Sequence, residues 1–159
     1  MTHQEPRLTI IIVSYNTCGW LQRCLESVNR QDVVNEVEVI VVDNASTDGS
    51  ADMVLDKFPE FDLTTLDSNV GFSGANNTGA AQATAPLLLF LNPDTEVLDG
   101  SLGEMITHLK ANPSCDVAGG KVYDEAGGVE RSTGSWPTLW SRILDRSLDY
   151  APERLVDAL

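Results

Sequence analysis

Basic residues are scarce in this 159-residue sequence, which has 10 Lys and Arg against 24 Asp and Glu and a formal net charge of −14 at pH 7. An acidic surface of this kind repels nucleic-acid phosphates and anionic lipid, so nucleic-acid binding is excluded. The sequence has only two histidines and three cysteines, without a CxxC motif or zinc-type spacing. An odd number of scattered cysteines is typical of a reducing compartment.

Long apolar runs are also missing, and none approaches the ~20 residues that a membrane-spanning helix needs. The first residues, MTHQEPR, lack the basic, apolar and small-residue order of a secretory signal. We therefore expect a cytoplasmic protein without a direct membrane span; partners that hold it at the inner membrane are an alternative.

What the sequence does contain is an alternation of apolar strand-like runs and helical patterns. The expected strands are Leu8–Ser14, Val37–Val42, Leu63–Leu66, Pro86–Leu91 and Val117–Val122. The expected helices cover about Thr17–Asn29, the stretch with Ala51, Val54, Leu55 and Phe58 on its apolar face, Ser73–Thr84, and the stretch with Leu102, Met105, Ile106 and Leu109. A hairpin turn is expected at Asp124–Gly128, leading into Val129–Ser132. This order predicts an α/β fold with a mainly parallel sheet and helices on both faces.

Strand composition and chain length give further expectations. Continuous apolar runs predict buried parallel strands over Leu8–Ser14 and Val37–Val42, and Pro86–Leu91 is the most apolar of the expected strands. We expect an N-terminal tail over residues 1–7, one domain over 8–135, and an amphipathic helical tail over 136–159.

Each of the first four expected strands is followed by small polar residues or a carboxylate. These are Ser14 to Thr17, Asp43 to Ser46, Asn69 to Asn77, and Asn92 to Glu96. In a parallel sheet, the carboxyl ends of the strands meet at one edge, where ligands bind. Each cluster also has a local explanation as a turn, a helix cap or a site of close packing, but four clusters at corresponding positions favour one binding cleft.

Several ligand classes are disfavoured by missing motifs. The first strand is followed by SYNTCGW rather than by the GxGxxG of dinucleotide-binding folds, and no GxxxxGK[ST] loop occurs. A GxSxG nucleophile motif is absent too. The remaining candidate is a nucleotide diphosphate held through a divalent cation, which would offset the charge repulsion in so acidic a protein. Asp94, at the mouth of the most apolar strand, is the expected protein ligand.

Four motifs in this order resemble family 2 glycosyltransferases, most closely the bacterial rhamnosyltransferase-like subgroup. They are TIIIVSYN, VIVVDNASTDGS, NVGFSGANNTGA and LLLFLNPDTEV, and the later KVYDEAGGVERSTGSWPTLW is similar to the same subgroup. The resemblance implies a GT-A fold and a hexosyltransferase-type enzyme of polysaccharide biosynthesis that inverts the anomeric carbon. It also implies a UDP-, dTDP- or GDP-linked sugar donor, an acceptor glycan or lipid-linked glycan, and Mg²⁺ or Mn²⁺.

The resemblance assigns roles to residues by position. The implied donor-nucleotide site consists of Ser14, Tyr15, Asn16, Asp43, Asn44, Ser46, Gly71, Phe72, Asn76, Asn77 and Asp94. Asp43 is expected to accept hydrogen bonds from the base or ribose. Asp94 matches the last carboxylate of the family's DxD-type signature and is the implied metal ligand, whereas Asn92 replaces the first acidic position. Glu96 is a second, less favoured candidate to assist.

The family's general base lies in an acidic segment after a GGFDE-like stretch, and neither feature occurs between Gly119 and Leu159. We therefore expect a C-terminally truncated enzyme that binds donor but transfers sugar poorly, with its general base unknown. Trp136, Trp140, Ile143 and Leu144 are candidates to cover exposed apolar surface or to form a homodimer contact. The alternatives are a non-catalytic nucleotide-binding module, a nucleotidyltransferase or a structural interaction protein.

Overall fold

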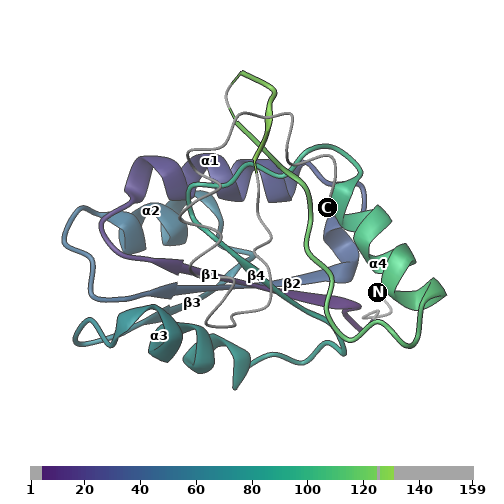
Figure 1. Cartoon of the computed structure of the whole chain (residues 1–159). Helices are drawn as coiled ribbons and strands as arrows, with labels where there is room; N and C mark the ends of the chain where they lie inside the picture. The colour runs from purple at the N-terminus through teal and green to yellow at the C-terminus, as the bar shows by residue number, and fades with distance from the viewer. Residues whose placement is uncertain (1–4, 125, 131–159) are drawn as a thin grey trace, which may run out of the picture. The chain divides into compact units, whose positions relative to one another are not determined.

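The computed structural model describes residues 5–124 and 126–130, and the chain divides into two compact units, one ending at Asp116 and one beginning at Val117 (Figure 1). The first unit contains a parallel sheet and its helices. Its strands are β1 (Leu8–Ser14), β2 (Val37–Asp43), β3 (Asp62–Thr65) and β4 (Leu88–Leu91). Its helices are α1 (Cys18–Asn29), a 3-10 turn η1 (Val34–Glu36), α2 (Ser50–Lys57), α3 (Gly71–Ala80) and α4 (Ser101–Ala111).

The four strands run parallel in the order β3-β2-β1-β4, so β1 lies inside the sheet between β2 and β4. All seven β1 residues are buried, as its apolar sequence predicts for a central parallel strand. The register pairs Ser14 with Asp43 and Ile12 with Leu91. The carboxyl ends of β1, β2 and β4 therefore meet at one edge of the sheet.

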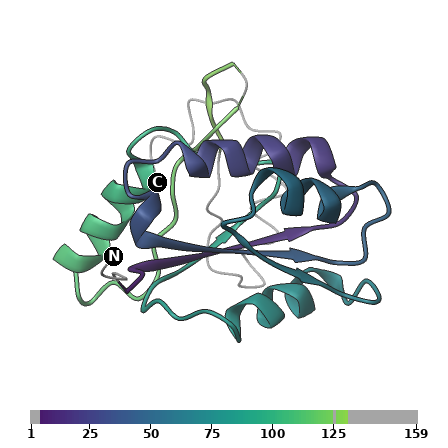
Figure 2. The same cartoon turned by 180° about the vertical axis from the view of Figure 1, so that it is seen from behind.

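Helices cover both faces of the sheet, as predicted. On one face, Ile10 and Ile12 of β1 pack with residues of α1 and α2 and with Leu102 and Ile106 of α4. On the other face, α3 contacts β1 and β2, and its Ala75 joins a smaller apolar cluster. Figures 1 and 2 show α1 and α2 on one side of the sheet and α3 on the other.

The most apolar of the expected strands, β4, is only partly buried. The strand is shorter than predicted, and Leu88 and Phe90 are 45% and 52% exposed. They share the α3 face of the sheet with Ile11, which pairs with Phe90, but α3 contacts β1 and β2. This face of β4 therefore stays accessible. Among the described residues, no strand pairs with the outer edge of β4.

Three smaller expectations also differ from the structure. Leu55 is 62% exposed, because the buried face of α2 is formed by Ser50, Met53 and Val54. Helix α3 begins two residues earlier than predicted and ends four residues earlier, at Ala80. The strand predicted over Val117–Val122 is a strand only from Val122 onward, and Val117 is 87% exposed.

The second unit contains a hairpin of β5 (Val122–Tyr123) and β6 (Val129–Glu130), which confirms the predicted turn. The Asp124 carboxylate accepts hydrogen bonds from the backbone N–H groups of Ala126 and Gly128, and Gly127 adopts a φ of 81°. Asp124 thus has a structural part in the turn. The four apolar residues proposed to cover exposed surface lie outside the described residues, and the limits 8–135 and 136–159 stay predictions.

Candidate functional site

The two carboxylates predicted to share a cleft, Asp43 and Asp94, follow the strands on either side of β1. Asp43 ends β2, and Asp94 follows β4 by three residues. Neighbouring strands are about 4.8 Å apart, so the two strand ends are roughly 10 Å apart at the backbone. The strand order therefore brings both carboxylates to the same edge of the sheet, on either side of Ser14.

Asp43 is buried, with 3% of its surface exposed, although it ends a strand at the ligand-binding edge. Its Oδ2 accepts a hydrogen bond from the backbone N–H of Ser46, 3.0 Å away. Its Oδ1 is also buried and has no hydrogen-bond partner among the described residues. A buried carboxylate oxygen without a partner is energetically unfavourable, which makes Oδ1 the polar atom most suited to accept a ligand donor.

Asn44 joins the end of β2 to the loop that leads into α3. Its Oδ1 accepts the backbone N–H of Val70 at 2.9 Å, and its Nδ2 donates to Asn69 Oδ1 at 3.0 Å. Asn69 Oδ1 also accepts the N–H of Gly71. Asn44 is 2% exposed, so the structure gives it the role of shaping the loops around the site.

Asn16 connects the loop after β1 with the loop after β2. Its backbone N–H donates to Ser46 Oγ at 3.0 Å, and its Oδ1 accepts the N–H of Thr47 at 2.8 Å. Asn16 and Ala45 have positive φ values of 55° and 67°, which are uncommon for residues other than glycine. Such strained positions cluster at functional sites, where the surrounding contacts hold them in place.

The remaining residues of the loop after β1 differ in accessibility. Ser14 is fully buried, and its Oγ is 2.8 Å from the hydroxyl of Thr17. Tyr15 is 49% exposed, so its ring is available to a ligand. Thr17 is the N-cap residue of α1, but its side chain makes no capping hydrogen bond and contacts Ser14 instead.

Asp48 has a role that the sequence analysis missed. Its Oδ2 accepts the backbone N–H of Cys18 at 2.8 Å, and its Oδ1 accepts the N–H and hydroxyl of Ser50. It thus holds the first turns of both α1 and α2. Its burial alone would raise the pKa of this carboxyl, but these hydrogen bonds outweigh burial and lower it. The partner Cys18 is 30 residues away, so no local pattern could have indicated the contact.

The predicted residues of α3 differ in how far a ligand can reach them. Phe72 is 60% exposed, and Gly71 and Asn77 are exposed as well. Asn76 is 8% exposed, and its Nδ2 donates to the carbonyl of Phe72 one turn earlier. The structure therefore gives Asn76 an intrahelical contact, and its predicted contact with ribose or sugar stays a prediction.

Asp94 lies in an irregular segment after β4, together with Glu96, and both side chains are exposed. Glu96 Oε1 is 4.0 Å from Arg23 Nε of α1. Among the described residues, no three His, Cys, Asp or Glu side chains gather into a group that would hold a metal ion. The protein therefore offers Asp94, with Glu96 two residues on, as oxygen ligands rather than a complete metal cage.

An open pocket of about 510 Å³ lies at the start of α1. Its lining consists of Asn16, Thr17, Cys18, Gly19, Trp20, Arg23 and Asp48. Of the predicted site residues, it includes only Asn16, whereas Asp43 and Asp94 are outside it. We regard the strand ends rather than this pocket as the candidate site, because Asp43 Oδ1, at the end of β2, is a buried carboxylate oxygen without a donor among the described residues.

Cys24 of α1 lies close to the Asp94 segment, with Sγ 3.6 Å from the carbonyl of Asn92. Burial, with the nearby carboxylates of Asp94 and Glu96, raises the pKa of the Cys24 thiol from 9.0 to about 12. Between these two pH values, the unfolded chain loses the proton while the folded protein keeps it. The thiol's contribution to stability is therefore complete below pH 9 and decreases as the pH rises toward 12.

We predict that Cys24→Ala reduces the loss of stability above pH 9. The expected slope from this one thiol is about 1.4 kcal/mol per pH unit, measured as the free energy of unfolding in urea from pH 8 to 11. Cys18→Ala, at a half-buried position on the same helix, is the control and should leave the slope as it is in the unsubstituted protein. Equal slopes for Cys24→Ala and the control would contradict the prediction.

Comparison with known proteins decides the family. The sequence matches "Glycosyl transferase family 2" over residues 9–154, which is most of the chain. The chain belongs to glycosyltransferase family 2. The family consists of transferase enzymes, which agrees with the resemblance of the four sequence motifs. The succinoglycan biosynthesis protein ExoO of Rhizobium meliloti is 34% identical over 107 residues, which are 67% of this chain and 30% of that protein.

Solved structures of similar proteins confirm the GT-A fold. Residues 1–349 of Staphylococcus aureus TarS in complex with UDP-GlcNAc superpose with a TM-score of 0.62 and 25% identity, covering 67% of this chain and 32% of that one. The Pyrobaculum calidifontis mannosyltransferase PcManGT, in complex with GDP-Man and Mn²⁺, gives a TM-score of 0.59 and 28% identity. It covers 67% of this chain and 33% of that chain.

This chain spans between 17% and 41% of the length of several curated glycosyltransferases that it matches. The family match over residues 9–154 includes strands β2 to β4, all of β1 except Leu8, and the loops that follow β1, β2 and β4. Within residues 5–124 and 126–130, none of the helices has the length and apolarity needed to cross a bilayer.

Proposed function

We propose that this chain is the donor-binding part of an inverting glycosyltransferase and that it holds a nucleoside-diphosphate sugar at the carboxyl ends of β1, β2 and β4. Similar proteins support this donor class, because TarS structures contain UDP or UDP-GlcNAc and the PcManGT structure contains GDP-Man. The acceptor in this proposal is a glycan or lipid-linked glycan of a cell-surface polysaccharide.

The observation that carries the proposal is the buried Oδ1 of Asp43, for which the described part of the chain supplies no donor. A base N–H or a ribose hydroxyl would satisfy this acceptor. Tyr15 directly follows β1, and its exposed ring is available to stack on a base. Asp43 and Tyr15 would thus bind the nucleoside, which leaves the diphosphate to extend toward Asp94.

The oxygen ligands near β4 fit a cation that is shared with the diphosphate. Mg²⁺ is commonly held by one or two carboxylates together with substrate phosphates, and Mn²⁺ prefers the same oxygen ligands. Asp94 supplies one such carboxylate at an exposed position, and Glu96 is a second candidate. When bound, the cation neutralises the charge that develops on the leaving diphosphate. Affinity for the cation should be weak until nucleotide is present.

In the proposed reaction, an acceptor hydroxyl attacks the anomeric carbon on the face opposite the diphosphate, and a carboxylate base takes its proton. The residues of this chain bind the nucleoside and orient the diphosphate; none of the described residues is assigned as the base. We therefore propose that the chain binds donor and transfers sugar poorly. A non-catalytic nucleotide-binding module of the same fold is the alternative, and turnover separates the two.

A thermal-shift panel of UDP, GDP, dTDP and CDP, each with and without Mn²⁺, tests donor binding. A ligand that binds only the folded state raises the midpoint temperature of unfolding. At a ligand concentration of 100 times the dissociation constant, the free energy of unfolding increases by about 2.7 kcal/mol. We expect one base to stand out and its shift to require Mn²⁺. No shift with any nucleotide would contradict the proposal. Robust turnover with UDP- or dTDP-sugars and a panel of acceptors would contradict the proposal that this chain transfers sugar poorly.

A further inference from the structure

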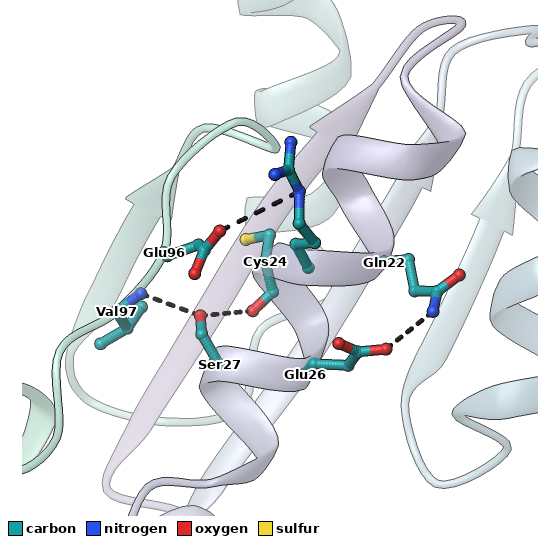
Figure 3. Close-up of polar contacts among 7 residues, drawn as sticks. Gln22, Cys24, Glu26, Ser27, Glu96 and Val97 are labelled. Carbon is teal, nitrogen blue, oxygen red and sulfur yellow. Dashed lines mark hydrogen bonds and ion pairs between the residues drawn. The ribbon is translucent and has the colours of Figure 1, made fainter. Parts of the chain in front are cut away.

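The segment from Asn92 to Leu98, which carries Asp94, contains no helix or strand, yet side chains of α1 contact it near both ends. Figure 3 shows the contact of Ser27 with Val97. At its start, the carbonyl of Asn92 is 3.6 Å from Cys24 Sγ. At its end, the backbone N–H of Val97 donates to Ser27 Oγ at 2.8 Å. Asp94 therefore lies between two points that are fixed to the same helix.

A third contact comes from Gln31, two residues beyond the end of α1. Gln31 Nε2 is 3.3 Å from the carbonyl of Val97 and 3.2 Å from that of Leu98. Cys24 and Ser27, three residues apart, share one side of α1, and Gln31 Nε2 also donates to the carbonyl of Ser27 at 3.2 Å. We call Cys24, Ser27 and Gln31 the polar stripe.

The side chains of the polar stripe are buried, although burying apolar side chains at these positions would cost less free energy. Ser27 is fully buried, and Gln31 is 2% exposed. Burying a hydroxyl or an amide without hydrogen bonds is unfavourable by about 1–3 kcal/mol. Ser27 Oγ and Gln31 Nε2 have partners that compensate, whereas Gln31 Oε1 is buried without a partner among the described residues. Some of those partners are local carbonyls of α1, and the others are backbone groups of the Asp94 segment.

Ser27 is the residue through which α1 controls this segment most directly. Its hydroxyl donates to the carbonyl of Cys24 at 2.6 Å, which leaves an oxygen lone pair directed at the N–H of Val97. Figure 3 shows Ser27 between these two groups, with Glu96 beside Val97. Because Val97 is only three residues after Asp94, this bond restricts where the Asp94 carboxylate lies.

We infer that Ser27 and Gln31 are positioning residues, which fix the Asp94 segment so that its carboxylate meets the cation and diphosphate of the donor. This inference rests on the proposed function. Neither side chain is assigned a contact with the ligand, since both are buried and bonded to backbone. Replacing a residue that orients a metal ligand, but does not itself bind the metal, typically lowers metal affinity by about 10- to 100-fold.

Ser27→Ala is the test variant, because it removes the hydroxyl and leaves the N–H of Val97 without its acceptor. Calorimetry measures the affinity for the preferred nucleoside diphosphate with and without Mn²⁺, and for the nucleoside alone. We expect Ser27→Ala to weaken the Mn²⁺-dependent affinity by about 10-fold or more and to leave the affinity for the nucleoside unchanged. Amide hydrogen exchange at Val97 should become faster at the same time.

Gln22→Ala is the matched control on the same helix. Its Nε2 donates to Glu26 at 2.7 Å on the exposed side, away from the Asp94 segment, so nucleotide affinity should not change. Asp94→Asn should remove the Mn²⁺-dependent part, and adding Ser27→Ala to it should have little further effect. A merely structural role of Ser27 would instead lower affinity with and without Mn²⁺ to a similar extent.

The outcomes separate this inference from the proposed function. If the unsubstituted protein binds nucleotide with a Mn²⁺-dependent gain and Ser27→Ala keeps that gain, the inference is overturned while the proposed function stands. The inference is also overturned if the losses of Ser27→Ala and Asp94→Asn simply add. An unsubstituted protein without any Mn²⁺-dependent nucleotide binding would overturn both.

Discussion

Asp43→Asn is expected to weaken binding of the preferred nucleotide by about 10- to 100-fold, because it replaces a charged acceptor at a buried position. A hydrogen bond to a charged group contributes about 1.5–3 kcal/mol, and one amide oxygen cannot serve both Ser46 and the ligand. If the amide oxygen accepts from Ser46 N–H, as Oδ2 does now, an NH₂ group faces the ligand's donor. Calorimetric titration with the nucleotide measures the change.

The stability of Asp43→Asn distinguishes a binding effect from unfolding. The substitution keeps the side-chain shape and removes a buried charge, so the free energy of unfolding should not decrease by more than about 1 kcal/mol. Asp52→Asn, at an exposed carboxylate in the first turn of α2, is the control and should bind nucleotide normally. Normal nucleotide affinity in Asp43→Asn would remove the main support for the proposed site.

Gly79→Ala is expected to destabilise the fold by about 1–3 kcal/mol, and Gly79→Val by more, because α3 lies directly on the sheet at this position. An added Cβ would be 2.6 Å from Ile11 Cγ2 and 3.2 Å from Val42 Cγ2. Both contacts are with fully buried side chains of the two central strands, which have little room to move. Urea unfolding measures the loss.

Gly19→Ala is the matched control for Gly79, since the Cβ that it would add in α1 has no described atom within 4 Å apart from its chain neighbours and the nearby backbone of the helix. Alanine is the better helix former, so this variant should be neutral or stabilised by up to about 1 kcal/mol. If Gly79→Ala were as stable as Gly19→Ala, α3 would have to pack further from the sheet than the structure has it.

The sequence predicted β1 and β2 well because both strands are central, and their β-branched runs are buried on two faces whatever the neighbouring helices do. Strand β4 is more apolar still, yet its Leu88 and Phe90 form an exposed face. Apolar composition does not report whether a strand has a neighbour on its second edge or a helix over its second face. For β4, that depends on α3, which packs on β1 and β2 instead.

The candidate site was predictable to a similar extent. Polar residues after apolar runs located the loops, and the parallel topology that the alternation predicted placed Asp43 and Asp94 on one edge. The contacts within the site were not predictable, because Asp48 with Cys18 and Ser27 with Val97 join residues 30 and 70 positions apart. Such pairs leave no local spacing in the sequence.

By itself, the sequence determined the class of fold, the sheet edge that carries the candidate site, and the family, because periodicity and ordered motifs are local properties of the chain. Only the tertiary structure decided which Asp43 oxygen is left for a ligand and which α1 side chains hold the Asp94 segment. Hydrogen-bond satisfaction and burial depend on all the atoms around a group, and those atoms come from distant parts of the chain.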